Sequence, residues 1–168
     1  MIKYLGSKRL LIPLILERVE ALDGVRTVLD LFSGTARVAH ALKERGYWVH
    51  ANDHNAYAAT LAACYVGAER RLWQARAERL IAELDALRGR PGWFTETFCR
   101  RARYFQPRNG ARIDAIRERI ARLSLEPALE AIALTSLMEA ADRVDSTDRK
   151  STRLNSSHLK LSRMPSSA

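Results

Sequence analysis

Two carboxylates and a glycine turn are the residues of this sequence whose types and spacing indicate chemistry. Asp30 opens the run Asp-Leu-Phe-Ser-Gly-Thr35, and Asp53 follows about 20 residues after the glycine. A glycine turn lets the backbone approach a ligand closely. A carboxylate at the end of the next strand can accept hydrogen bonds from both hydroxyls of a ribose. Together these residues predict a site for a nucleoside-containing cofactor.

The class of cofactor is narrowed by what the turn lacks. The sequence has neither the G-x-G-x-x-G pattern of a dinucleotide site nor the G-x-x-x-x-G-K pattern of a nucleotide P-loop. Asp30 and Phe32 beside the single Gly34 suit a cofactor without phosphates, whose ammonium group a carboxylate can hold. This turn resembles the first motif of S-adenosylmethionine-dependent methyltransferases, and the expected cofactor is S-adenosylmethionine.

The elements that must position these residues follow from the apolar pattern. Residues 25–32 and 47–51 have the β-branched, apolar profile of buried parallel strands, and residues 36–45 between them have helical spacing. Strand, helix and strand in this order predict a right-handed crossover and a parallel sheet. Further helices are expected at residues 10–20, 54–66, 69–87, 111–123 and 127–144, whereas residues 93–109 show little regular periodicity.

A second motif narrows the family. Lys3-Tyr-Leu-Gly-Ser-Lys8 resembles the opening K-[WY]-x-G-x-K motif of Dam-type DNA adenine methyltransferases. The resemblance extends over nearly all of residues 1–147. It implies methyl transfer from S-adenosylmethionine to adenine in double-stranded DNA. It also implies the residues of the cofactor site, namely Tyr4, Lys8, Asp30, Phe32, Ser33, Gly34 and Asp53.

The resemblance also sets the expected fold and its parts. We expect an α/β fold, with an incomplete Rossmann-like methyltransferase sheet followed by a helical second half. Residues 1–90 are expected to form the N-terminal part of the cofactor-binding domain. Residues 91–147 are expected to form a helical target-recognition region.

Two departures from the family pattern concern function. Ala36 stands where many methyltransferases have a second glycine, and alanine is acceptable there only if φ stays negative. No D-P-P-Y tetrapeptide occurs, although in the family this motif grips the amine of a flipped-out adenine. We therefore expect no catalytic residue in this chain, and we expect a fragment that is inactive by itself.

Other interpretations of the same residues remain open. Tyr4 is also compatible with a core aromatic, Lys8 with a solvated charge, and Asp53 with a helix cap. A non-catalytic DNA-binding or accessory module is the alternative function, because the tetrapeptide is missing. A methyltransferase acting on RNA or a small molecule fits the glycine turn but not the N-terminal motif.

The central segment is basic and aromatic. Arginines and aromatic residues there can contact DNA phosphates and stack on bases, or they can form a solvated face over core aromatics. The sequence favours neither interpretation. The candidate DNA-binding residues are Arg100, Arg101, Arg103 and Arg108, with Trp93, Tyr104 and Phe105 beside them.

Residues 148–168 are expected to be a non-native, disordered tail. The run from Asp148 to His158 resembles one reading frame of a widely used sequencing adapter, and residues 159–168 have no periodicity. The whole chain carries a formal charge of +9, whereas residues 1–147, with 23 basic and 18 acidic residues, carry +5. Charge alone is therefore a weak indication of a DNA partner.

Targeting and metal signals are not found in the sequence. No run of about 18 apolar residues and no signal peptide is present, so we expect a soluble, cytoplasmic protein without a membrane partner. Cys64 and Cys99 fit no metal or disulfide pattern. We expect two buried or partly buried free thiols and no metal site.

Overall fold

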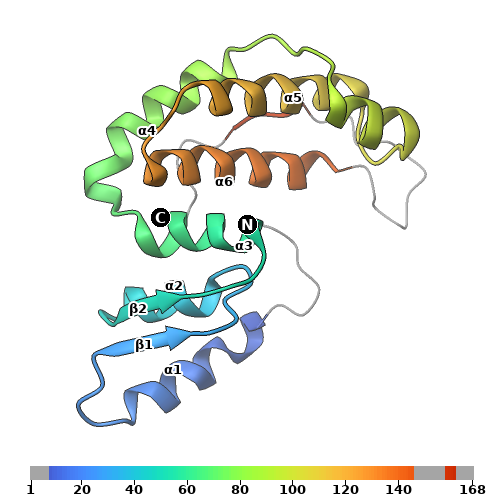
Figure 1. The fold of residues 1–168 in the computed structure, drawn as a ribbon. Helices are drawn as coiled ribbons and strands as arrows, with labels where there is room; N and C mark the ends of the chain where they lie inside the picture. Colours follow the sequence, from blue (N-terminus) through green and yellow to red (C-terminus); the bar gives the residue numbers. More distant parts are fainter. Residues whose placement is uncertain (1–7, 146–157, 162–168) are drawn as a thin grey trace.

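The computed structural model describes residues 8–145 and 158–161, in which helices dominate around a small parallel sheet (Figure 1). The sheet and the first two helices form one end of the molecule, and the later helices form the other. The elements in order are η1 (Lys8–Leu11), α1 (Ile12–Glu20), β1 (Thr27–Asp30), α2 (Arg37–Glu44), β2 (Trp48–Ala51), α3 (Ala56–Ala62), η2 (Ala63–Gly67), α4 (Arg70–Asp85), η3 (Thr95–Arg101), α5 (Pro107–Arg122) and α6 (Pro127–Val144).

The sheet consists of β1 and β2, which pair in parallel with Val28 opposite Val49. The helix α2 connects them, as the strand, helix and strand pattern predicts. One face of the sheet packs Val28 and Val49 against a core of Leu16, Val38 and Leu42 from α1 and α2. The mixed α/β class is therefore confirmed.

The opposite face of the sheet differs from the expectation of strands buried on both faces. Leu29 is 60% exposed and Trp48 is 70% exposed. Successive side chains of a strand point to opposite faces, so covering one face leaves alternate residues open. Among the described residues no element covers this second face. A two-stranded sheet does not by itself establish a Rossmann-like sheet.

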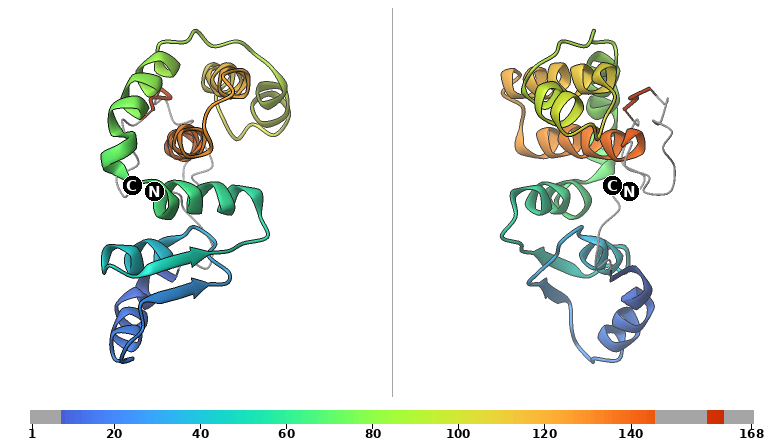
Figure 2. Two further views of the ribbon diagram at one scale, coloured as in Figure 1. Left: turned by 60° about the vertical axis from the view of Figure 1, so that its left-hand side comes forward. Right: turned by 90° about the vertical axis from the view of Figure 1, so that its right-hand side faces the viewer.

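The helical half has its own, larger core, in which α6 is central. The helix α6 packs against α3, η2, α4 and α5 (Figure 2). Its buried residues include Ile132 and Leu137, which meet Leu84 of α4 and Ile116 of α5 in one cluster. Proline occupies the first turn of both α5 and α6, where its missing N–H costs nothing.

Two π-helices, η2 and η3, interrupt the expected pattern. Residues 93–109 look irregular in sequence, but residues 95–101 form η3, and α5 begins at Pro107 rather than near residue 111. The close packing of η3 on α5 depends on Gly110, because a side chain there would collide with Cys99.

Cys64 and Cys99 are both free and buried, which confirms the prediction of two buried or partly buried free thiols.

Only residues 158–161 of the predicted tail are described. Leu159 and Leu161 are buried against the helical half, and the Leu159 N–H donates to Asn109 Oδ1 at 3.1 Å. The non-native origin of residues 148–168 stays a prediction. Within the described ranges, no helix combines the length and the apolar character that a membrane crossing requires.

Candidate functional site

The carboxyl ends of the two strands are tied together by hydrogen bonds that continue beyond the sheet. The Asn52 N–H donates to the Asp30 carbonyl at 2.9 Å, and the Ser33 N–H donates to the Asn52 carbonyl at 2.9 Å. The Asn52 side-chain amide also donates to the Leu31 carbonyl at 2.9 Å. These contacts hold the glycine turn and the end of β2 in one fixed arrangement.

Asp53 joins the end of β2 to the glycine turn. Its Oδ2 accepts the Gly34 N–H at 2.8 Å, and its Oδ1 accepts the Asn55 N–H at 2.9 Å. Gly34 has φ +52°, a left-handed conformation that favours glycine. Asn55, and not Asp53, occupies the N-cap position of α3, and its side chain makes no capping hydrogen bond. The Asp53 carboxylate therefore faces the turn.

The hydrogen bonds to Asp53 also set its charge. The Asn55 N–H and then the Gly34 N–H lower the pKa of this carboxyl from its ordinary value, because both stabilise the charged form. The group is ionised at neutral pH. A carboxylate has about four acceptor positions, so each oxygen keeps room for a hydroxyl donor once the longer Asn55 Nδ2 contact at 3.3 Å is released.

Lys8 and Asp30 lie on the other side of the same turn. Lys8 Nζ donates to the Phe32 carbonyl at 3.0 Å and lies 3.9 Å from Asp30 Oδ1. The Asp30 side chain is only 8% exposed. Its Oδ2 and the Ser33 hydroxyl are buried without a hydrogen-bond partner among the described residues. Buried polar atoms of this kind require an explanation, and a bound ligand is one.

The structure thus brings together six of the seven predicted cofactor residues. Phe32 is 73% exposed beside the turn, and space is open around Gly34. A groove of about 440 Å³ runs along β2 from Val49 to Asp53 and is closed by α3 and η2. Tyr4 lies outside the described residues. The assignment of these residues to a cofactor stays a prediction.

Ala36 departs from the expectation of a negative φ. Its φ is +56° and the residue is fully buried. The condition for alanine at this position is therefore not met, because the turn that ends in Ala36 folds back on itself, with the Ala36 N–H donating to the Ser33 carbonyl at 2.8 Å. An L-residue pays roughly 1–2 kcal/mol in this conformation. The backbone of the turn therefore carries strain at the position where many relatives of the fold have glycine.

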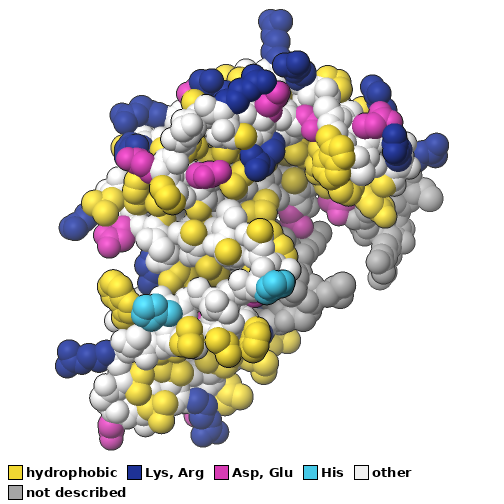
Figure 3. Space-filling model, in the orientation of Figure 1, with side chains coloured by type: hydrophobic (Ala, Val, Ile, Leu, Met, Phe, Trp, Pro, Cys, Tyr) yellow, Lys and Arg dark blue, Asp and Glu magenta, His cyan; other side chains and the backbone are white. Residues whose placement is uncertain are grey.

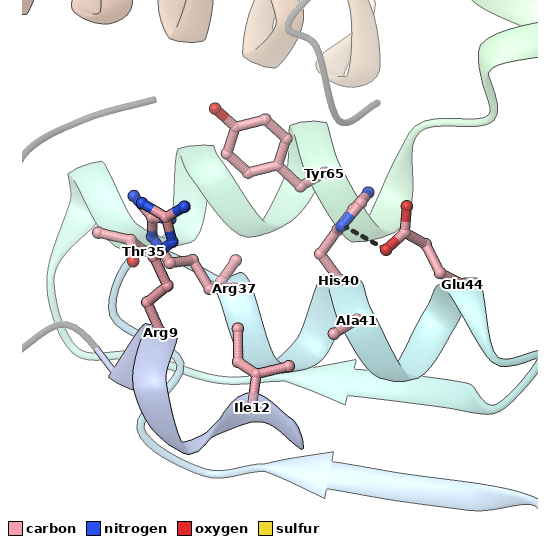
Figure 4. Close-up of a pocket in the computed structure, with 9 residues that line it drawn as sticks. Arg9, Ile12, Thr35, Arg37, His40, Ala41, Glu44 and Tyr65 are labelled. Carbon is pink, nitrogen blue, oxygen red and sulfur yellow. Dashed lines mark ion pairs between the residues drawn. The ribbon is translucent and has the colours of Figure 1, made fainter. Parts of the chain in front are cut away.

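A hollow of about 270 Å³ lies behind the turn (Figure 4). Arg9 and Ile12 form one wall, and Thr35 to Glu44 form another. Figure 4 shows Tyr65 above the hollow and His40 beside Glu44, and His40 Nδ1 lies 3.5 Å from the Glu44 carboxylate. None of the six described cofactor residues lines this hollow.

The predicted DNA-binding arginines are dispersed around η3. Arg100 and Arg101 both pair with Glu96, at 3.2 and 3.4 Å, so one carboxylate offsets part of their charge. Arg103 is exposed with φ +58°, and Arg108 is exposed in the first turn of α5. No observed contact tests whether any of them binds DNA.

Asp114 is a residue whose role the sequence did not reveal. Its carboxylate accepts hydrogen bonds from the N–H groups of Gly92, Phe94 and Thr95, and from the Thr95 hydroxyl, at 2.6–2.9 Å. Burial raises the pKa of Asp114, but these hydrogen bonds outweigh burial and lower it overall. The only signal in sequence was the resemblance of residues 1–147 to the family, which did not single out Asp114.

A second unpredicted contact joins the two halves of the chain. The Tyr65 hydroxyl, from η2, donates to Glu139 Oε1 of α6 at 2.8 Å, and both side chains are buried. Arg143 lies 3.3 Å from the other carboxylate oxygen. The contact orients α6 on the segment that follows the strands, so it supports the site only indirectly.

Comparison with known proteins identifies the family. The model for the D12 class of N6 adenine-specific DNA methyltransferases matches residues 4–162. The chain belongs to this family. The match includes both the glycine turn and the Asp114 segment, and it extends into the predicted tail.

A curated relative supports the same assignment. The chain is 28% identical, over 156 residues, to the Type II methyltransferase M.NlaIII of Neisseria lactamica. The aligned region is 86% of this chain and 46% of the relative, so the chain spans about half the length of the protein it matches. No solved structure matches the chain.

Proposed function

We propose that this chain is part of an enzyme that transfers a methyl group from S-adenosylmethionine to the exocyclic amine of adenine in double-stranded DNA. The family match over residues 4–162 is the observation that carries this proposal. The name of the relative extends it to a modification enzyme of a restriction-modification system. The sequence contains no D-P-P-Y tetrapeptide, so we propose that this chain is inactive by itself.

The residues at the strand ends fit S-adenosylmethionine. When bound, this cofactor supplies an electrophilic methyl group on its sulfonium. The buried Asp30 Oδ2, which lacks a partner among the described residues, can accept from the ammonium group. Asp53 is held toward the turn and can accept from the ribose hydroxyls. Phe32, Ser33 and Gly34 would line the pocket, and Lys8 would hold Asp30 and the turn in place.

The proposed division of labour follows the two halves of the chain. Residues 1–90 would contribute the cofactor site of a Rossmann-like sheet that is larger than the two strands described. Residues 91–147 would contribute the region that contacts DNA. Arg100, Arg101, Arg103 and Arg108 are proposed phosphate contacts, which position a duplex without reading its sequence.

Calorimetric titration with S-adenosylmethionine tests the cofactor site directly. The wild-type chain is expected to bind, and Asp30→Asn and Asp53→Ala are each expected to weaken binding about tenfold to a hundredfold. Losing a hydrogen bond to a charged group costs about 1.5–3 kcal/mol, which corresponds to this range. The exposed Asp23, changed to Asn, is the matched control and is expected to leave binding unchanged.

Two results would contradict the proposal. One is absence of binding by the folded wild-type chain. The other is equal affinity for the cofactor in Asp53→Ala, Asp30→Asn and the Asp23→Asn control. Binding of ATP in place of S-adenosylmethionine would instead indicate a phosphate-containing ligand, which the sequence of the turn disfavours.

A further inference from the structure

Trp93 is a large aromatic side chain that the fold holds at the surface. It is 72% exposed, although a tryptophan gains much from burial. Its ring contacts Phe98 edge-on, with the ring centres 5.5 Å apart, and Phe98 in turn contacts Phe94 at 4.8 Å. Phe94 continues the series to Phe105 at 5.1 Å. The indole is thus the outermost member of a packed aromatic series.

The backbone around Trp93 is fixed by one carboxylate. Asp114 accepts the N–H groups of Gly92 and Phe94, the residues on either side of Trp93, at 2.8 and 2.9 Å. The next N–H, of Thr95, is bound by the same group at 2.8 Å. Because the side chain is already ordered, a ligand that contacts it loses little conformational entropy. Hydrogen bonds therefore hold the backbone on both sides of the indole.

The positive charge of the chain is concentrated in the segment that contains Trp93. Residues 88–122 hold ten arginines and three acidic residues, a net charge of +7, and two of these arginines, Arg112 and Arg119, pair with Asp85 and Glu83 outside the segment. The remainder of residues 1–147 holds 13 basic and 15 acidic residues, a net charge of −2. Figure 3 shows more Lys and Arg side chains over the helical half than over the sheet. A polyanion is therefore attracted to this segment.

The element that follows Trp93, η3, lies on the side of the molecule toward which the two strands point. The carboxyl ends of β1 and β2 point toward the side on which η3 lies in Figure 1. The right-hand view of Figure 2 looks onto that side. A hollow of about 270 Å³ lies beside the indole, between Arg90 and Glu118, which leaves space for a planar ring.

We propose that Trp93 stacks on a base that is unstacked from the bound DNA duplex and so positions the DNA on the protein. The inference rests on the proposed function, because it takes duplex DNA as the partner. Aromatic side chains stack on unstacked bases of any sequence, and basic side chains beside them hold the phosphates. Trp93 is thus a positioning residue. Asp114 acts through Trp93 by fixing the backbone of residues 92–95.

Fluorescence anisotropy of a labelled short DNA duplex, titrated at several salt concentrations, tests the inference. Trp93→Ala is expected to weaken binding about tenfold, since a base stack is worth roughly 1–3 kcal/mol. The slope of affinity against salt should not change, because no phosphate contact is lost. Trp93→Phe should keep most of the affinity. Trp48→Ala removes an equally exposed tryptophan from the sheet and is expected to bind like the wild type.

A direct signature of stacking is available from tryptophan emission. The chain has three tryptophans, so Trp48→Phe with Trp73→Phe leaves Trp93 as the sole reporter. Addition of the duplex is expected to quench its emission. A quench that is equal for a variant retaining only Trp48 would overturn the inference.

The remaining outcomes separate this inference from the proposed function. Base stacking by Trp93 is refuted if the wild type binds DNA and Trp93→Ala binds it equally well. It is also refuted if Trp93→Ala loses affinity and the dependence of affinity on salt concentration becomes weaker as well. In both cases DNA binding by the wild type remains supported. If the wild-type chain binds no duplex at low salt, the inference is also refuted. The cofactor titration decides the proposed function independently of both results.

Discussion

Replacing Asp114 with Asn is the perturbation that most directly tests how the region around Trp93 is held. In the structure Asp114 Oδ2 accepts from the Gly92 N–H, the Thr95 N–H and the Thr95 hydroxyl, whereas Oδ1 accepts from the Phe94 N–H. All four partners donate. An asparagine has one acceptor oxygen, and its NH₂ group can only donate. In either rotamer, therefore, the NH₂ group of the asparagine faces at least one of these four donors.

The magnitude follows from the better of the two rotamers. With the amide oxygen in the Oδ2 position, three hydrogen bonds persist in weakened form and the Phe94 N–H faces an NH₂ group. Loss of one hydrogen bond to a charged acceptor, with a partly buried donor left unpaired, costs about 1–3 kcal/mol. For a chain of this size, a loss of about 2 kcal/mol lowers the melting temperature by roughly 4–8 °C.

Urea unfolding followed by circular dichroism, with Asp23→Asn as the exposed control, measures this loss. The stability that Asp114 contributes is also expected to depend on pH. Hydrogen bonding lowers the pKa of folded Asp114, so its contribution is present above the ordinary carboxyl pKa of about 4 and is lost as pH falls through the lower, folded value. The difference in stability between the wild type and Asp114→Asn should therefore shrink in acid.

Equal stability of Asp114→Asn and the wild type at neutral pH would refute the claim that the Asp114 hydrogen bonds stabilise residues 92–95. So would a stability difference that grows as the pH falls below about 4. An Asp114→Asn variant that is destabilised but binds DNA as tightly as the wild type would confirm that Asp114 stabilises residues 92–95. It would also show that Asp114 has no part in positioning Trp93.

Two further predictions concern packing and thiol chemistry. Gly110→Ala is expected to destabilise the chain by about 1–3 kcal/mol in urea unfolding, because the new methyl would collide with the Cys99 sulfur. Cys99→Ala should relieve much of that loss, and a Gly110→Ala variant as stable as the wild type would contradict the close approach. Burial raises the pKa of the Cys64 thiol to about 11, so iodoacetamide should not modify it in the folded chain at neutral pH. Mass spectrometry in native buffer and in urea measures this, and rapid native modification would show the burial to be wrong.

Much of the candidate site could be predicted from the sequence because its signals are local. The Asp30 to Thr35 run and Asp53 are separated by a segment of helical spacing, and a crossover of that kind brings consecutive strand ends to one edge. The contact between Asp53 and Gly34 follows from this order of elements. The N-terminal motif supplied Lys8, which lies beside Asp30.

Other features depend on contacts between residues far apart in the chain. Nothing near Asp114 indicates that its carboxylate binds a turn some 20 residues earlier. The pairing of both Arg100 and Arg101 with Glu96 arises because η3 is a π-helix, a conformation that short-range patterns do not predict. The positive φ of Ala36 likewise follows from the path of the turn and not from the preference of alanine.

The sequence by itself determined the strand, helix and strand unit, the glycine turn, and the carboxylate that meets it, since periodicity and turn chemistry act over a few residues. Only the tertiary structure decided which polar groups are satisfied, which face of the sheet is open, and which tryptophan is held at the surface. Those outcomes depend on packing and burial between distant segments, which local patterns in the sequence do not predict.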